Sequence, residues 1–271
     1  MPKNPKPLQV MGILNVTPDS FSDGGRYNQL DEAIIRASQL IEHGADILDI
    51  GGESTRPGSD AVSEAEELDR VIPVIEAIKQ RFDIPVSIDT TKAKVMTESV
   101  NAGASLINDV NALREEGAVE AAAKAGVEVC LMHMQGQPRT MQEHPHYDDI
   151  VCDVKRFFQE RIDVCTDAGI AREKIWLDPG FGFGKTPRHN YQLLQRLQAF
   201  HELQLPLLIG LSRKSMIGHV TGRDVSERLA GSLAGATIAA MKGARIIRVH
   251  DVKETVDAMK VVAATLEGEH I

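Results

Sequence analysis

The sequence predicts a single α/β domain over residues 1–271, with the (β/α)8 barrel fold also called the TIM barrel. Eight short apolar runs recur along the chain, and segments with helical periodicity separate them. The runs are apolar throughout rather than alternating, which is typical of parallel strands covered on both faces. The same alternation could build an open doubly wound sheet. Because there are eight runs and nearly all end in a polar residue, closure into a barrel is favoured.

The expected strands follow the apolar runs, and the expected helices lie between them. Strands are expected over residues 8–14, 45–50, 85–88, 104–107, 127–132, 174–177, 206–210 and 244–249. Helices are expected over residues 31–43, 63–81, 92–102, 118–124, 148–167, 191–203, 226–242 and 252–266. In the first helix Ile34, Ile35, Leu40 and Ile41 are expected to fall on one side. In the second, Pro73 requires a kink or a late start.

A recurring phrase marks the passage from helix to strand. A glycine follows five of the helical segments directly or after one residue: Gly44, Gly103, Gly126, Gly169 and Gly243. Glycine readily adopts the left-handed conformation that ends many helices. Each of these glycines is therefore expected to end a helix and turn the chain into the next buried strand.

The composition excludes several classes of protein. Hydrophobic residues make up 42% of the chain, which is enough for a large core, and the formal net charge of −9 opposes binding to nucleic acid or anionic lipid. No stretch approaches the roughly 20 apolar residues of a membrane span, and no secretion signal precedes the first run. We therefore expect a cytoplasmic protein whose residues 1–7 form a flexible extension. Cys130, Cys152 and Cys165 form no CxxC pair and are expected to be packing residues in a reduced compartment.

Residues able to bind a ligand stand at the ends of the apolar runs. They are Asn15, Gly51, Glu53, Asp89, Asn108, His133, Asp178, Ser212, Arg213, Lys214 and His250. The carboxyl ends of barrel strands meet at one face, so these residues are expected to converge there. A single Asp or Asn after a strand is more often a turn or a helix cap, but eight such ends together indicate a binding site. His133 is expected to pack or to form a wall, and no group of residues resembles a zinc site.

Cationic residues gather late in the chain. Arg213 and Lys214 follow the seventh run, while Arg248 and His250 lie at the end of the eighth. The segments after these two strands often hold a phosphate in a barrel, so an anionic ligand group is expected here. A solvated charge pair is the alternative for Arg213 and Lys214. Lys214 could also be a Schiff-base nucleophile.

Glycine-rich segments follow several runs. The segment after the sixth run does not fit the GxxxxGK[ST] phosphate-binding loop, because the first glycine would fall at Pro179. We interpret residues 180–184 as a flexible turn that brings Phe183 close to a flat ligand. Residues 17–25 and 51–58 are expected to be mobile loops that close over a substrate.

Eight phrases carry a resemblance to a known family. They are MGILNVTPDSFSDGG, DIGGESTRPG, SIDTTK, IND, LMHMQGQPRTMQ, LDPGFGFGKT, GLSRKS and RVHDV. In this order and spacing they resemble the dihydropteroate synthases, from Met11 to Asp251. The resemblance implies a TIM barrel that condenses 6-hydroxymethyl-7,8-dihydropterin diphosphate with 4-aminobenzoate, giving 7,8-dihydropteroate and diphosphate in folate synthesis. A dihydropterin can delocalise a methylene cation, so Mg2+-assisted departure of diphosphate before amine attack is expected.

The resemblance also implies roles for individual residues. The pterin diphosphate site would comprise Thr55, Asp89, Asn108, Met132, Asp178, Lys214, Arg248 and His250. The aminobenzoate site would comprise Thr55, Arg56, Pro57, Phe183, Arg213 and Ser215. The catalytic residues would be Asp89, Lys214, Arg248 and His250, and Asn15 would bind Mg2+. Carboxylates suit the amino group and ring N–H of a pterin, and oxygen ligands suit Mg2+.

Other functions fit part of the pattern. They are another pterin-binding barrel such as a methyltransferase domain acting on a folate, an aldolase using Lys214, and a noncatalytic pterin-binding or scaffolding protein. The SRKS and RVHD phrases favour the synthase, and Asn15, Arg248 and His250 argue against loss of diphosphate chemistry. The resemblance implies a homodimer. The alanine- and glycine-rich helix over residues 226–242 could pack against a second copy or against its own barrel.

Overall fold

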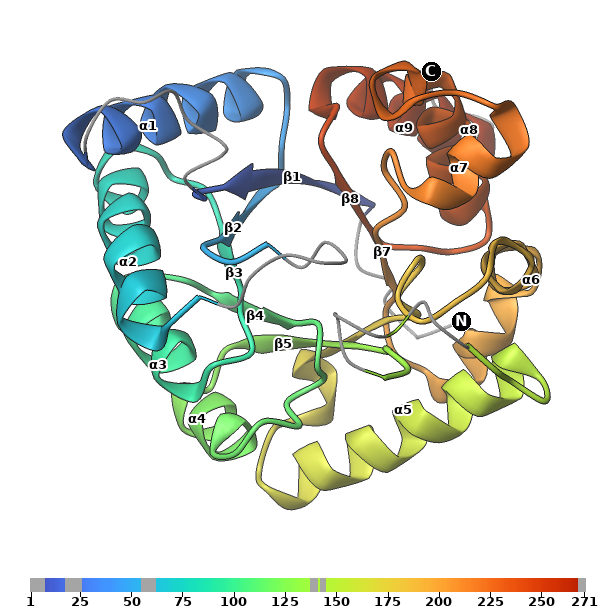
Figure 1. Ribbon diagram of the computed structural model, residues 1–271, viewed down its shortest axis with the longest axis horizontal. Helices are drawn as coiled ribbons and strands as arrows, with labels where there is room; N and C mark the ends of the chain where they lie inside the picture. Colours follow the sequence, from blue (N-terminus) through green and yellow to red (C-terminus); the bar gives the residue numbers. More distant parts are fainter. Residues whose placement is uncertain (1–7, 18–25, 55–61, 137–140, 142–144, 268–271) are drawn as a thin grey trace.

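Eight parallel strands form one sheet in the order β6-β5-β4-β3-β2-β1-β8-β7. The computed structural model describes residues 8–17, 26–54, 62–136, 141 and 145–267. The strands are β1 (Gln9–Asn15), β2 (Ile47–Gly51), β3 (Val86–Asp89), β4 (Leu106–Asp109), β5 (Glu128–Met132), β6 (Ile175–Asp178), β7 (Leu208–Ile209) and β8 (Ile246–Val249). Figure 1 shows the strands around a common centre, with the helices outside them.

The barrel closes between the two end strands of the sheet, β6 and β7. Leu177 and Leu207 form a parallel bridge, and the backbone N–H of Leu177 donates to the carbonyl of Pro206 at 3.0 Å. The other neighbouring strands are joined by parallel ladders. The predicted (β/α)8 barrel is therefore confirmed, and the alternative of an open doubly wound sheet is wrong.

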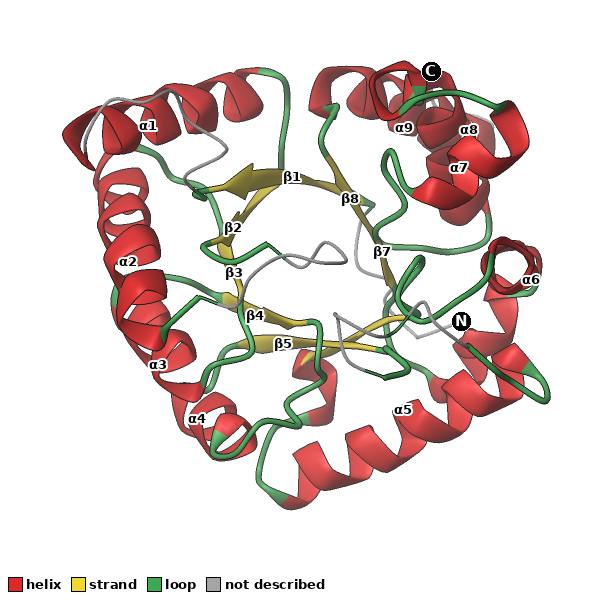
Figure 2. Ribbon diagram, viewed as in Figure 1, coloured by secondary structure: helices red, strands yellow, loops and turns green. Residues whose placement is uncertain are grey.

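Helices cover the outside of the barrel (Figure 2). They are α1 (Arg26–Glu42), α2 (Glu64–Arg81), α3 (Ala93–Asn101), α4 (Ala118–Ala125), α5 (Ile150–Asp167), α6 (Pro187–Gln195), α7 (Ser215–Thr221), α8 (Leu229–Met241) and α9 (Val252–Glu267), with short 3-10 helices η2 (Arg172–Lys174), η3 (Leu197–Leu203) and η4 (Val225–Glu227). Their apolar sides pack on the outer faces of the strands in one large core, which includes Ile75, Phe158 and Phe200. Within the described ranges, no helix combines the length and apolarity that crossing a bilayer requires.

Helix α2 begins where the sequence predicts. The Ser63 side chain accepts from the Glu66 N–H, and the Glu66 carboxylate accepts from the Ser63 N–H. This reciprocal capping box fixes the first turn. Pro73 lies inside the helix, so a late start is wrong.

Three helices differ from the sequence expectations. Helix α1 begins at Arg26 rather than at residue 31, because residues 26–30 contain no glycine or proline to stop it. Helix α6 begins earlier than residue 191, since Thr186 caps it and Pro187 occupies the first helical position, where proline is favoured. The rest of the helix expected there is the separate 3-10 helix η3, and the short helix α7 was not expected.

The glycines of the recurring phrase adopt the predicted left-handed conformation. Gly44 shows the consequence, because its N–H donates to the Ile41 carbonyl at 2.9 Å and the Ala45 N–H donates to the Leu40 carbonyl at 3.0 Å. These bonds satisfy carbonyls at the end of α1 that have no partner within the helix. The φ angle is likewise positive at Gly103, Gly126, Gly169 and Gly243.

A second apolar cluster fills the inside of the barrel, and we call it the barrel floor. It comprises Met11, Ile47, Leu106, Cys130, Trp176, Leu208 and Ile246. Cys130 and Cys165 are buried packing residues as expected, whereas Cys152 is exposed and that expectation is wrong. The floor closes the barrel interior beneath the carboxyl ends of the strands.

Candidate active site

The inward-facing positions directly above the barrel floor form a layer, which we call the polar layer after its members Asp49, Asn108, Asp178 and Arg248. Alternate residues of a strand face the same side, so the residue two positions after each floor residue also faces inward. These positions are Ile13, Asp49, Asn108, Met132, Asp178, Gly210 and Arg248. On β3, Ser87 lies in register with Asp49 of β2 and Leu106 of β4. Asp89 is the next inward-facing residue of β3 and lies in register with Asn108 of β4. The predicted convergence at one face is therefore confirmed for these strands.

Arg248 joins two carboxylates that come from different strands. Its Nε donates to Asp49 Oδ2 at 2.5 Å, and its Nη2 donates to Asp89 Oδ2 at 2.7 Å. The Asn108 amide donates to the same Asp49 oxygen at 3.2 Å. Asp49 is 0% exposed and Asp89 is 8% exposed, so both are buried carboxylates held by one guanidinium.

Burial governs the proton affinities of this cluster. It raises the pKa of Asp89; Arg248 opposes the rise and the negative charge of Asp49 adds to it. Burial acts to lower the pKa of Arg248, but Asp49 and Asp89 outweigh it, and the net pKa is raised. Among the described residues, the Oδ1 atoms of Asp49 and Asp89 are buried without a hydrogen-bond partner. Since buried polar atoms are normally paired, these oxygens are acceptors suited to the N–H groups of a ligand.

Asp178 and Lys214 place a second acid and base at the same face. Asp178 is 5% exposed, and its Oδ1 accepts from the Gly180 N–H at 2.8 Å. Burial raises the pKa of Asp178, with Lys214 as the main opposing charge. Burial lowers the pKa of Lys214 to about 8, against the attraction of Asp178. Lys214 is therefore mainly a cation at neutral pH.

Gly210 keeps the space between Arg248 and Asp178 open. A Cβ at this position would lie 3.8 Å from the Cβ and Cδ of Arg248 and 4.0 Å from Asp178 Oδ2. Met132 belongs to an apolar cluster beside this space, and Phe183 packs against that cluster. The compartment therefore combines polar groups for the edge of a ring with apolar surface for its face.

The segment 180–184 differs from the flexible turn expected there. Lys214 Nζ donates to the Phe181 carbonyl and lies 4.6 Å from the centroid of the Phe183 ring. Buried Lys185 donates to the carbonyls of Gly180 and Phe183. The interpretation as a flexible turn is wrong, because these bonds fix the segment, while the expected proximity of Phe183 to the site is confirmed.

Asn15 and Asp89 present oxygens to one space beside Gly51. A Cβ on Gly51 would lie 3.6 Å from Asn15 Oδ1 and 3.9 Å from Asp89 Oδ2. Mg2+ prefers oxygen ligands and commonly takes only one or two from the protein, the rest being water and phosphate oxygens. Across the described ranges, no group of three or more His, Cys, Asp or Glu side chains could hold a metal. These donors therefore fit a Mg2+ ion that a diphosphate helps to bind.

The side chains of Ser212 and His250 are paired. The Ser212 hydroxyl oxygen accepts from the His250 backbone N–H at 3.3 Å and lies 3.0 Å from His250 Nδ1. With the Ser212 hydroxyl donating to Nδ1, the ring proton of His250 lies on Nε2. In this tautomer Nε2 is a hydrogen-bond donor, as an anionic ligand requires.

The residues expected to bind aminobenzoate are only partly brought together. Thr55, Arg56 and Pro57 lie outside the described residues. The Arg213 guanidinium is held by Asp251, with Nε 2.8 Å from Oδ2. Ser215 is exposed at the start of α7, and Phe183 lies beside Lys214 as described above.

Three residues behave differently from the sequence expectation or were not singled out. Asp49 stands inside an apolar run, and its position two residues after Ile47 could have revealed it. Lys185 is buried, although its motif had been discounted as a phosphate-binding loop. Glu53, expected to face a ligand, is instead paired with Lys92, which also bonds buried Glu67.

His133 is buried and packs edge-on against Phe157, so its expected packing role is confirmed.

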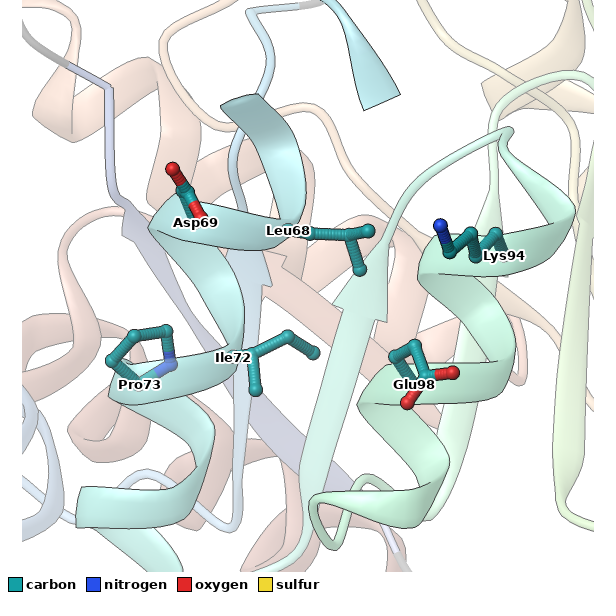
Figure 3. Close-up of a pocket in the computed structure, with 6 residues that line it drawn as sticks. All are labelled: Leu68, Asp69, Ile72, Pro73, Lys94 and Glu98. Carbon is teal, nitrogen blue, oxygen red and sulfur yellow. The ribbon is translucent and has the colours of Figure 1, made fainter. Parts of the chain in front are cut away.

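A hollow on the outside of the barrel lies apart from these residues. It occupies about 410 Å3 between α2 and α3 (Figure 3) and is lined by Leu68, Asp69, Ile72, Pro73, Lys94 and Glu98. Figure 3 shows these side chains on the outer helices, and none of them belongs to the polar layer. The hollow therefore does not compete with the barrel mouth as the candidate site.

Comparison with known proteins identifies the family. Residues 11–250 match the family described as "Pterin binding enzyme". The chain is 62% identical over 260 residues to a dihydropteroate synthase of Escherichia coli, covering 96% of this chain and 92% of that protein. It is 56% identical over 257 residues to one of Haemophilus influenzae, covering 95% and 94%. The chain belongs to the dihydropteroate synthase family. It is therefore an enzyme of the transferase class, and these relatives support neither the aldolase nor the methyltransferase alternative.

Solved structures of the dihydropteroate synthase family share this fold closely. A Yersinia pestis dihydropteroate synthase in complex with a sulfonamide drug superimposes with a TM-score of 0.91 at 61% identity, covering 97% of this chain and 95% of that chain. A Xanthomonas albilineans dihydropteroate synthase with 4-aminobenzoic acid gives a TM-score of 0.91 at 52% identity, covering 96% and 93%.

Proposed function

We propose that the chain condenses 6-hydroxymethyl-7,8-dihydropterin diphosphate with 4-aminobenzoate, in the presence of Mg2+, to give 7,8-dihydropteroate and diphosphate for folate synthesis. The observation that carries the proposal is the polar layer above the barrel floor. There Arg248 bonds Asp89 and Asp49, and Asn108 bonds the same Asp49 carboxylate. Asp178 lies buried at the same mouth of the barrel. This combination suits a flat heterocycle with an anionic tail.

The pterin ring is proposed to bind with its polar edges against the buried carboxylates. The amino group and ring N–H would donate to Asp89 and Asp178, whose side chains are 8% and 5% exposed. Asn108 and Lys214 would contact the remaining ring heteroatoms. Met132 would lie against the face of the ring, since it belongs to the apolar cluster that Phe183 contacts.

The diphosphate is proposed to bind at the ends of β8 and β2, to Arg248, His250 and Thr55. The carbon–oxygen bond breaks with its electron pair on the diphosphate, and the resulting methylene cation is delocalised into the dihydropterin. Arg248 and His250 would stabilise the departing anion, while Asp89 would stabilise the pterin cation. Asn15 would hold Mg2+, which when bound would neutralise part of the diphosphate charge.

The amine of 4-aminobenzoate is then proposed to donate its lone pair to the methylene carbon, forming the carbon–nitrogen bond and losing a proton. Phe183, Arg213 and Ser215 would line its site together with Thr55, Arg56 and Pro57. The Xanthomonas albilineans relative was solved with 4-aminobenzoic acid, which supports this substrate class. The Yersinia pestis relative was solved with a sulfonamide drug, which supports sulfonamides as a second class of ligand for this chain.

A homodimer through α8 is part of the proposal. The sequence of α8 is LAGSLAGATIAAM, without a charged residue, and an all-apolar helix is normally covered. Ala234, Ile238 and Met241 are nevertheless exposed, and Ile238 is 43% exposed. A second copy of the chain would cover this stripe.

The proposed function is tested by measuring diphosphate release from the pterin diphosphate. Reactions with and without 4-aminobenzoate and Mg2+ are compared, and dihydropteroate is quantified in the same samples. We expect equal amounts of the two products when all components are present, and a large loss when Mg2+ is removed. Absence of dihydropteroate from the complete reaction would refute the proposal.

A further inference from the structure

Lys185 is a buried lysine whose amine, among the described residues, contacts carbonyls and one ring nitrogen rather than a carboxylate. The residue is 2% exposed, and burial lowers the pKa of its amine well below the usual range. Burying an ammonium group is unfavourable unless its hydrogen bonds are made. The lysine is therefore expected to contribute something that an apolar side chain at this position could not.

The Lys185 amine connects the segment after β6 to the end of β5. Nζ lies 2.8 Å from the Gly180 carbonyl and 2.9 Å from the Phe183 carbonyl. It also lies 3.2 Å from the His133 carbonyl and 2.9 Å from His133 Nδ1. One amine thus links Gly180 and Phe183 of the segment 180–184 to His133, which follows β5.

Further bonds hold the rest of this segment. The Gly182 N–H donates to Asn190 Oδ1 at 2.7 Å, and the Tyr147 hydroxyl donates to the Gly184 carbonyl at 2.8 Å. The backbone also lies tightly against β5, because a Cβ on Gly180 would come within 1.9 Å of the His133 carbonyl oxygen. Lys185 is the centre of this arrangement, since its amine bonds both the segment and His133.

The same segment contacts groups of the candidate active site. The Gly180 N–H donates to Asp178, and the Phe181 carbonyl accepts from Lys214. The Phe183 ring lies beneath the Lys214 amine. A shift of this backbone would therefore move the partners of Asp178 and Lys214 and would displace the Phe183 ring.

We propose that Lys185 is a positioning residue that sets the affinity for both substrates by fixing the segment 180–184. This inference rests on the proposed function, because it takes the pterin to bind at Asp178 and Lys214 and the aminobenzoate to bind at Phe183. The Lys185 amine acts through Gly180 and Phe183 and does not touch the reacting atoms. Its loss should therefore weaken binding more than it slows the chemical step.

The test compares Lys185→Met with Lys79→Met in steady-state condensation assays. Lys79 is a matched control, because its Nζ donates to one carbonyl, that of Ile84, at 2.9 Å before β3. For Lys185→Met we expect the KM of both substrates to rise about tenfold or more, as expected when buried carbonyls lose their donor. We expect kcat to stay within about threefold, and both constants of the control to match the wild type.

Pterin binding is measured separately through the fluorescence of Trp176, the sole tryptophan of the chain, which lies in the barrel floor. A folded Lys185→Met variant with wild-type KM values and pterin affinity would overturn the proposal. If that variant does not fold, Tyr147→Phe removes one bond from the same segment, and a smaller rise in both KM values is expected. Unchanged KM values in Tyr147→Phe would then overturn it. Wild-type protein that forms no dihydropteroate would instead refute the proposed function.

Discussion

Arg248 on β8 and Asp89 on β3 are 159 positions apart in the sequence and are joined by a 2.7 Å hydrogen bond from Nη2 to Oδ2. Asp49 of β2 binds the Nε of the same guanidinium. The partly buried guanidinium of Arg248 thus links side chains of three strands through two buried carboxylates. Because one oxygen of each carboxylate has no partner in the part of the chain that the structure describes, the cluster combines a structural role with acceptors for a ligand.

Replacing Arg248 by methionine would leave Asp49 and Asp89 buried without their cation. Removing one partner of a buried ion pair costs about 3 kcal/mol. We expect the free energy of unfolding at pH 8 to fall by that order and product formation to be lost. Urea denaturation measures the free energy of unfolding. The double variant Asp49→Asn with Arg248→Met should recover part of the stability, because it also removes one of the two unpaired carboxylates. Unchanged stability of the single variant would contradict the role of the cluster.

Gly210→Ala tests whether the space between Arg248 and Asp178 is the ligand site. The added methyl group makes only ordinary contacts, so we expect the free energy of unfolding to change by less than about 1 kcal/mol. The methyl group would occupy space needed by the pterin, and the Kd of the pterin should rise about tenfold or more. Calorimetric titration measures the Kd. An unchanged Kd in a stable variant would place the pterin elsewhere.

Asp178→Ala removes the acceptor proposed for the polar edge of the pterin. The unpaired ligand group should weaken binding by about 2 kcal/mol, which is about thirtyfold in Kd. Asp178→Asn is the matched control, because it keeps one oxygen as an acceptor and should lose less affinity. Equal affinities of both variants and the wild type, measured by calorimetry, would exclude Asp178 from the pterin site.

Asp109 predicts a pH dependence of stability. Its carboxylate accepts from the N–H groups of Asn111 and Leu113, both at 2.7 Å. Burial nevertheless raises the pKa of Asp109 from 3.8 to about 7, against the lowering effect of these bonds. The folded state therefore binds the proton more tightly than the unfolded chain. The stabilising contribution of Asp109 is present below the unfolded pKa and is lost as the pH rises through 7.

We therefore expect Asp109 to contribute a fall in the free energy of unfolding between pH 4 and pH 7, and Asp109→Asn to remove that contribution from the slope over this range. Urea denaturation at a series of pH values measures the slope. Asparagine can accept only one of the two hydrogen bonds from Asn111 and Leu113, so the variant should also be less stable at every pH. The two proteins are therefore compared by the slope of stability against pH, and not by their absolute stability. A slope identical to that of the wild type would show that Asp109 does not titrate in this range.

Ile238→Glu tests the proposed dimer. A buried charge in the stripe on α8 should oppose association, and light scattering should show a shift from dimer to monomer. Val164→Glu on α5 is the matched control, because Val164 and Ile238 are both 43% exposed. The control should remain dimeric. A wild-type chain that is monomeric at every concentration would contradict the proposal.

The sequence carries enough information for the barrel and much of the site because each is a local pattern. Apolar runs predict the strands, and a polar residue after a run predicts a position at the barrel mouth, as for Asp89 and Asp178. The start of α6 could also have been predicted, since Thr186 and Pro187 form a standard helix start. Counting inward positions along β2 would have revealed Asp49.

Other features depend on long-range contacts that no local pattern encodes. Lys185 and His133 are 52 positions apart, and nothing near Lys185 in the sequence indicates that its amine binds that residue. The rigidity of segment 180–184 follows from such contacts, whereas its glycine content alone suggested flexibility. Likewise, Glu53 comes shortly after β2, where a ligand-binding residue is expected. It is instead paired with Lys92, which lies in the loop after β3.

The most direct test of the central claim is a crystal structure of the chain with the pterin diphosphate or a non-reactive analogue. We predict that the ring lies above Trp176, within hydrogen-bond distance of Asp89 and Asp178, and that the diphosphate lies beside Arg248 and His250. A ring bound outside the barrel mouth, with these four side chains unchanged and making no contact to it, would contradict the account.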